Sequence, residues 1–405
     1  MTILNNYSQF STHHWETGTI KNYLEYRGFL AEHNKKPYSE ALLMGISGGL
    51  VMGYFSFAYK GYDPHVVILT RNTFDPLDTL LSRLGVEQEL KHTGIPEKGY
   101  TNLVDTLDKG LPAIIWADMY SLPHNTLPLD DGMWGMAPII VYGIDESRDE
   151  VWIADRAEVP LKITVDQLAA ARSRVKKDKY RILTISEPNP KKIKLAVEKG
   201  IWDSIKLYTE KPPKGAANNF GYLAYQRFSD ILTNPKARMS WAKEFPVGAK
   251  LFAGLSSTFT SAFVYGKKGE SLDAERLLFA DFLKEATVIL EKPGLAKAVS
   301  KMEKSAASWK NLAMQIFPDG ISLLKESREL ILEKDLLFRK NGSKEIQRMK
   351  EINSRLDEIK ELFENDYPLS DNETEKLLGG IAEAVMSIHD KEKEAIDILQ
   401  EEMVK

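Results

Sequence analysis

The chain has 405 residues, of which 43% are hydrophobic and 28% are charged, and it contains no cysteine. This length allows two or three domains with buried cores, and 7 Trp, 16 Tyr and 16 Phe residues exclude a disordered chain. Without cysteine there is no disulfide, iron–sulfur cluster or thiol nucleophile, and a net charge of −4 argues against a nucleic-acid binder.

No targeting or membrane segment is expected. The first residues contain no basic cluster followed by an apolar run, which is what a signal peptide requires. The most apolar stretch, residues 42–57, is interrupted by four glycines and is too short to span a bilayer. We therefore expect a cytoplasmic protein with neither membrane nor nucleic-acid partners.

The first 187 residues are predicted to form an α+β domain. Residues 17–30 favour a helix, and a second, short helix is expected over residues 166–175. Short β-rich runs bounded by Gly, Pro or Asp predict strands at 66–70, 113–118, 139–143, 151–154 and 180–185.

The remainder is predicted to be an α-helical domain, residues 191–405, joined through the Pro-rich segment 187–190. Helical periodicity is clear at 191–208, 220–232, 273–290 and 295–316. From about residue 321 the tail carries 14 basic and 21 acidic residues, typical of long solvated helices. Its expected breaks are Asn341–Gly342, Pro368 and Gly379–Gly380.

A glycine-rich stretch, residues 45–53, lacks both the lysine of a phosphate-binding loop and the glycine spacing of a dinucleotide fold. Close backbone packing, or a turn that lines a pocket, explains it better than phosphate binding.

The densest group of reactive side chains is Ser11-Thr-His-His-Trp-Glu-Thr-Gly18, at the start of the first helix. A helix N-terminus suits an anion or a developing oxyanion. The alternative is simple capping by Thr12 or His13, with Glu16 favourable in the first turn. Adjacent histidines seldom reach one metal ion, so we expect no metal site and no cofactor.

Two runs, His14-Trp-Glu-Thr-Gly-Thr-Ile-Lys-Asn22 and Tyr38-Ser-Glu-Ala-Leu-Leu-Met-Gly-Ile-Ser-Gly-Gly49, resemble the family of butirosin biosynthesis protein H. The segments 139–145 and 151–155 fit the second half of that family's domain. Further on, 218–221, 240–241 and 276–286 are similar to the helical domain of unassigned function that commonly follows it.

The resemblance implies a papain-like or bacteriocin-peptidase-like N-terminal fold and acyltransferase chemistry in secondary metabolism. The family's named member moves an aminoacyl group from an acyl carrier protein to an amine, using a thiolate, a histidine and an orienting acid. Carried over by position, Trp15 stands where the cysteine is expected and Ala137 where the histidine is expected. Only the acid has a counterpart, Asp155.

Two readings of this altered site stay open, besides a purely structural one. In the first, the chain is a pseudoenzyme whose old cleft binds a small polar or amine-bearing ligand. The indole rings of Trp15 and Trp134 would then take a cation. The polar ligand-binding candidates are Thr17, Asp118 and Asn125.

In the second reading, acyl or amide transfer proceeds without cysteine. Its catalytic candidates are His14, Glu16 and Asp155, with a nearby Thr as nucleophile or the loop residue His124 as base. The partners expected are a small molecule, an acyl carrier protein or a second copy of the chain, and the third hypothesis is an interaction protein.

Two smaller motifs remain. The segment 71–76 could bind a substrate carboxylate through Arg71, although a turn stabilised by Asn72 and Asp75 is the better interpretation. The segment Lys211-Pro-Pro-Lys-Gly215 is typical of a connection or a binding loop.

Overall fold

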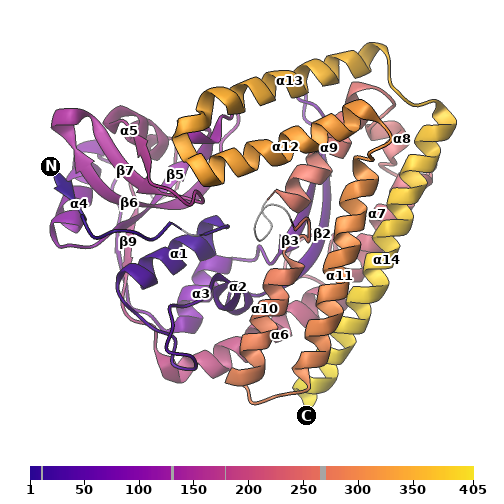
Figure 1. Cartoon of the computed structure of the whole chain (residues 1–405). Helices are drawn as coiled ribbons and strands as arrows, with labels where there is room; N and C mark the ends of the chain where they lie inside the picture. The colour runs from indigo at the N-terminus through magenta and orange to yellow at the C-terminus, as the bar shows by residue number, and fades with distance from the viewer. Residues whose placement is uncertain (11, 129–131, 178, 265–270) are drawn as a thin grey trace. The chain divides into compact units, whose positions relative to one another are not determined.

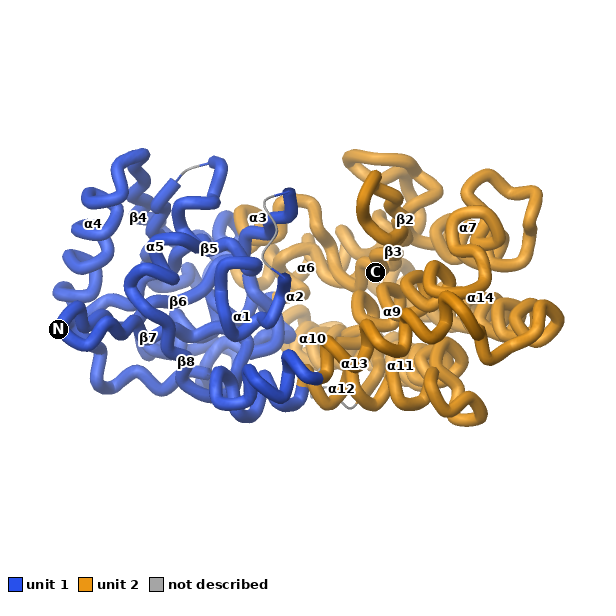
Figure 2. The backbone as a smooth tube through the Cα atoms, turned by 90° about the horizontal axis from the view of Figure 1, so that it is seen from above, with its two compact units in different colours: residues 1–43, 81–192, 336–351 blue, residues 44–80, 193–335, 352–405 orange. Residues whose placement is uncertain are grey.

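The computed structural model describes residues 1–405 except 11, 129–131, 178 and 265–270. Its described part divides into two compact units, which Figure 2 colours separately. Unit 1 comprises residues 1–43, 81–192 and 336–351, and unit 2 comprises 44–80, 193–335 and 352–405. The predicted ranges 1–187 and 191–405 divide the chain once, whereas these two units are interleaved along it.

Unit 1 is built on an antiparallel seven-stranded sheet with the order β4-β9-β5-β6-β7-β8, in which β1 also pairs with β6. Buried aliphatic residues fill β5 and β6 on both faces, so this is the core of the unit. The strands are β1 (Thr2–Ile3), β4 (Gln88–Lys91), β5 (Ala113–Asp118), β6 (Met136–Asp145), β7 (Glu150–Ala154), β8 (Leu161–Ile163) and β9 (Ile182–Ile185).

The helices of unit 1 include α1 (Trp15–Tyr26), α4 (Pro96–Asp108) and α5 (Val165–Ser173). Helix α1 packs on β6, and the Thr19 hydroxyl donates to the Pro138 carbonyl at 3.0 Å. Two more helices, α2 (Glu40–Ile46) and α3 (Pro76–Leu84), continue from one unit into the other.

Unit 2 is mostly helical, with one hairpin of β2 (Leu50–Phe57) and β3 (His65–Arg71). Its helices are α6 (Pro190–Thr209), α7 (Gly221–Thr233), α8 (Trp241–Glu244), α9 (Ala249–Phe263), α10 (Arg276–Ile289), α11 (Leu295–Ile316) and α14 (Asp371–Val404). Helices α12 (Ser322–Asn341) and α13 (Ile346–Asn365) belong to it only in part, because residues 336–351 are in unit 1. Figure 1 shows α11 and α14 running side by side, and α7 and α10 also contact this pair. None of the described helices is both long and apolar enough to cross a membrane.

The α+β class with a mostly helical C-terminal part is confirmed. The strand predicted at 113–118 and the helix predicted at 295–316 have those bounds in the structure, and the other predicted elements shift by a few residues at their ends. Strand β2 was not predicted, because its continuous apolar run has no alternation to mark it as a strand.

The glycine-rich stretch serves close packing, as predicted. A Cβ on Gly45 would lie 2.2 Å from the Phe282 ring, and one on Gly200 would lie 2.0 Å from the Gly45 carbonyl oxygen. The chain then turns at Gly48 and Gly49, whose φ angles of +118° and +68° favour glycine.

The break predicted at Gly379–Gly380 is wrong, since α14 passes through both residues without interruption. Gly380 lies against α11, where an added Cβ would be 3.2 Å from the Gln315 side chain. Packing of α14 on α11 therefore outweighs the local cost of about 1 kcal/mol for a glycine in a helix. The breaks at Asn341–Gly342 and Pro368 are confirmed.

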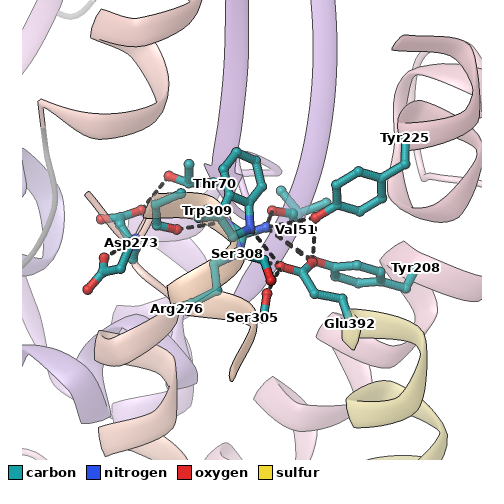
Figure 3. A network of polar contacts seen from close by, with 12 residues as sticks. Val51, Thr70, Tyr208, Tyr225, Asp273, Arg276, Ser305, Ser308, Trp309 and Glu392 are labelled. Atoms are coloured by element: carbon teal, nitrogen blue, oxygen red, sulfur yellow. Dashed lines mark hydrogen bonds and ion pairs between the residues drawn. The ribbon is translucent and has the colours of Figure 1, made fainter. Parts of the chain in front are cut away.

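A buried polar network forms the centre of unit 2 (Figure 3). The Glu392 carboxylate on α14 pairs with Arg276 on α10 at 2.7 Å, and both side chains are fully buried. The hydroxyls of Tyr208 on α6 and Tyr225 on α7 donate to the same carboxylate. Two groups on α11 also donate to it, the Ser305 hydroxyl at 2.7 Å and the Trp309 indole N–H at 2.9 Å. Five helices are thus joined at one carboxylate.

The charges in this network are stabilised by their partners. Burial alone would raise the pKa of Glu392, but Arg276 and the two tyrosine hydroxyls lower it below the usual value. The remaining Arg276 donors reach the Ala274 and Val51 carbonyls at 2.6 Å and 3.2 Å. A fully satisfied buried ion pair specifies which helices meet more than it adds net stability.

We expect Glu392→Gln to lower the free energy of unfolding by roughly 3–5 kcal/mol, because it leaves the Arg276 charge buried without its counter-ion. Urea denaturation followed by tryptophan fluorescence measures this. The double variant Glu392→Leu with Arg276→Met removes both charges and is expected to recover much of the loss. If Glu392→Gln unfolds at the wild-type urea concentration, the network does not hold the helices together.

Candidate functional site

The helix that begins at Trp15 carries the predicted reactive cluster. His14 is the N-cap residue of α1, not Thr12 or His13, and no side chain of the cap bonds to the helix. The capping role passes to the Glu40 carboxylate at the start of α2, which accepts the backbone N–H groups of His13 and His14 at 2.9 Å each. The predicted local cap is therefore wrong, because a remote carboxylate replaces it. Ser11 lies outside the described residues.

The two catalytic candidates on this helix face each other. Nδ1 of His14 lies 2.9 Å from a carboxylate oxygen of Glu16, and both side chains are partly exposed. Thr17 is buried, and its hydroxyl donates to Glu40 at 3.0 Å. Glu40 thus makes the start of α1 locally negative, which disfavours an oxyanion there.

Trp15 is the first residue of α1, and its indole face holds a cation of the chain itself. The Arg156 guanidinium lies 4.1 Å from the centre of the Trp15 ring and 4.8 Å from that of Phe338. The guanidinium also donates to Oδ1 of Asn125 at 2.8 Å and, through Nε, to Oδ1 of Asp155 at 3.4 Å; the Arg156 backbone N–H donates to the same Asp155 oxygen at 2.7 Å. Two aromatic rings and two oxygen acceptors therefore surround one guanidinium, a favourable arrangement for a cation.

Asp155 is paired with a histidine, although not one on β6. Nε2 of His124, in the short 3₁₀ helix Pro123–Asn125, lies 3.1 Å from Oδ2 of Asp155. The side chains are 0% and 1% exposed. Burial alone would raise the pKa of Asp155, but the Arg156 charge and the His124 hydrogen bond lower it below the usual value. The carboxylate is therefore ionised at neutral pH.

Ala137, at the position where the family's histidine is expected, contributes to the packing of the sheet. Ala137 is a buried residue of β6 and pairs with Ala117 of β5. Because α1 packs on β6, the positions expected for the nucleophile and the base stand on contacting elements, occupied by Trp15 and Ala137.

Asp118 ends β5 and is satisfied within the chain. It accepts hydrogen bonds from the Ser121 hydroxyl at 2.8 Å and the Gly135 backbone at 2.9 Å, and it pairs with Arg174 at 3.0 Å. Its side chain is 1% exposed. These contacts favour the structural role over ligand binding for Asp118.

Trp134 is 43% exposed, and its ring is covered by a different cation, Lys176, at 4.8 Å. The two tryptophans of the ligand-binding hypothesis thus each contact a lysine or arginine of their own.

The structure brings together Trp15, Asn125 and Asp155 around Arg156, and His14 with Glu16 at the helix start. Sequence reasoning missed Glu40, Arg156 and Phe338 as members of the site. Arg156 could have been identified from the sequence. It follows Asp155 directly, and a buried aspartate needs a positive charge nearby. Phe338 comes from a distant helix, and no local pattern points to it.

Among the described residues, no group of three or more His, Asp or Glu side chains is arranged to hold a metal ion.

Asp155→Asn is expected to lower the free energy of unfolding by roughly 2–4 kcal/mol at neutral pH, because it removes the counter-charge of Arg156. The pKa of Asp155 is depressed in the folded state, so its contribution is present above about 3.9, the unfolded value, and is lost as pH falls below it. Urea denaturation at a series of pH values should show the two proteins converging in acid. Asp105→Asn, on the exposed side of α4, is the matched control. An equal effect of both substitutions would contradict the role of Asp155.

Comparison with known proteins finds a family match for part of this chain. No curated protein matches it. Residues 14–156 match the family model described as butirosin biosynthesis protein H, N-terminal, and these residues include Trp15, His124, Asp155 and Arg156. The resemblance of this segment to the butirosin biosynthesis protein H family is therefore confirmed, in a chain that has no cysteine.

Proposed function

We propose that this protein is a papain-like homologue of the acyl and aminoacyl transferases that binds, rather than transforms, a small polar or amine-bearing ligand. The stacking of Arg156 on Trp15, at the helix position where the family's nucleophile is expected, carries this proposal. An indole cannot attack a thioester, but it attracts cations through its π face.

The residues around Arg156 would suit an ammonium or guanidinium group of a ligand. Asn125 and Asp155 supply oxygen acceptors, and Phe338 supplies a second aromatic face. The Arg156 side chain is 10% exposed whereas that of Asp155 is 1% exposed, so the arginine lies on the solvent side of the pair. A ligand amine would replace Arg156, whose contact with one ring is worth about 0.5–2 kcal/mol.

The first test measures binding of amines to three variants by isothermal titration calorimetry, with glucosamine and spermidine as probes. Arg156→Ala is expected to bind them more tightly than the wild type, because the ring and the acceptors are vacated. Adding Trp15→Leu to Arg156→Ala should abolish the gain. Arg181→Ala is the matched control, since Arg181 also stacks on a tryptophan, Trp116, at 3.4 Å. Equal binding by Arg156→Ala and Arg181→Ala would reject the amine site.

A second candidate function, acyl transfer without cysteine, is favoured by the His124–Asp155 pair. Asp155 holds one ring nitrogen, and Nδ1 is buried with no hydrogen-bond partner among the described residues. A histidine oriented by an acid through one nitrogen can remove a proton through the other. In this mechanism the amine of the acceptor attacks the thioester carbonyl directly and His124 takes the amine proton. The carbon–sulfur bond then breaks, and His124 returns the proton to the leaving thiolate, which departs as the thiol. An acyl carrier protein would be the partner that presents the thioester.

The second test incubates the protein with a glycyl thioester of N-acetylcysteamine and an amine acceptor, and measures amide and free thiol by mass spectrometry. If transfer occurs, His124→Gln is expected to slow it about 100-fold or more, the usual contribution of a general base. His92→Gln makes the same chemical change at an exposed histidine; it is the control and should retain transfer. Transfer unaffected by His124→Gln, or no transfer above the uncatalysed rate, would reject this mechanism.

A further inference from the structure

A cavity of about 280 Å³ lies in unit 2, beside the C-terminal end of α6. The two sequence motifs that the proposed function leaves unused meet there, because its lining includes Asn72 and Phe74 from the segment 71–76 and Lys211 and Pro213 from the segment 211–215. Residues more than 130 positions apart therefore form one concave surface.

The 71–76 side of the cavity is a fixed turn. Oδ1 of Asn72 accepts the Phe74 backbone N–H at 2.8 Å, and Asp75 has a φ of +50°. The Arg71 side chain points to another partner, Glu275, with Nε 3.0 Å from the carboxylate. The stabilised turn is thus confirmed, and Arg71 already has a carboxylate from its own chain.

The floor of the cavity is apolar. Phe74 and Leu207 both line it and belong to one packed cluster with Val51 and Phe220. The rings of Phe74 and Phe220 are 5.3 Å apart. A rigid, half-buried aromatic floor suits an apolar group of a ligand.

Charges of both signs line the remaining wall. Lys206, Glu210 and Lys211 are exposed lining residues, and none of them forms an ion pair with any residue that the structure describes. Lysines alone would attract any anion, but Glu210, which also lines the cavity, repels one. A ligand that carries both charges satisfies both signs.

We propose that this cavity binds a small zwitterion with an apolar body, in the chemical class of a free α-amino acid. The carboxylate would lie between Lys206 and Lys211, the ammonium at Glu210, and the apolar side chain on Phe74 and Leu207. The volume is just below the range of about 300–1,000 Å³ for small-molecule sites, so it suits an amino acid better than a nucleotide or a large cofactor. This site is independent of Trp15 and Arg156.

Isothermal titration calorimetry with the full chain tests the proposal, with L-leucine and L-phenylalanine as probes. At least one of them is expected to bind saturably. Leucinamide lacks the carboxylate and N-acetyl-leucine lacks the ammonium, so each is expected to bind at least about tenfold more weakly, as the loss of one charge-assisted contact implies. Equal affinity for these single-charge analogues, or no saturable binding of either amino acid, would overturn the proposal.

Substitutions inside and outside the cavity lining test whether the amino acid binds in this cavity. Lys206→Gln and Glu210→Gln lie at the surface, so both are expected to fold and each to weaken binding about fivefold. Lys250→Gln and Glu401→Gln make the same chemical changes at exposed positions outside the cavity lining and should leave binding unchanged. Trp15→Leu should also bind normally, which separates this site from the proposed amine site. Binding that survives both Lys206→Gln and Glu210→Gln would place the ligand elsewhere and overturn the assignment.

Discussion

The Glu392–Arg276 ion pair is the constraint on which the helical unit depends. A carboxylate and a guanidinium with no solvent access are tolerable only if every donor and acceptor finds a partner. This requirement is met by tyrosines from α6 and α7, by a serine and a tryptophan from α11, and by the backbone carbonyls of Val51 in β2 and of Ala274. An arrangement that separated α10 from α14 would leave a buried charge unpaired, so the ion pair favours the observed packing.

The sheet unit contains a second cluster of the same kind, and it changes how the family resemblance is understood. Asp155 is where the orienting acid is expected, but its partners are His124, from a loop, and Arg156, its neighbour. Trp15 and Phe338 enclose the guanidinium. Trp15, which stands where the resemblance implies the nucleophile, thus has its indole face covered by an internal cation, Arg156.

Much of the fold followed from local patterns, and the failures have specific causes. Alternating and β-branched residues located β5 and β7, and three- and four-residue spacing located α11. Strand β2 was not predicted because a strand buried on both faces shows no alternation of polar and apolar residues. The helix break predicted at Gly379–Gly380 was wrong because packing on α11 keeps α14 helical there. In the site, Trp15 and Asp155 were identified from the motifs, and both contact Arg156 in the structure. The capping by Glu40 was not, since this residue lies 26 positions after His14, whose backbone N–H it accepts.

The sequence by itself determined which chemistry is absent. Without a cysteine anywhere in the sequence, acyl transfer through a cysteine nucleophile of this chain is excluded whatever the fold. Only the tertiary structure decided what takes its place, because the contacts that matter join distant segments. Arg156 reaches Trp15 across 141 positions of sequence, His124 reaches Asp155, and the turn at Asn72 shares a cavity with Lys211. Such pairings depend on long-range packing, for which a local pattern carries no signal.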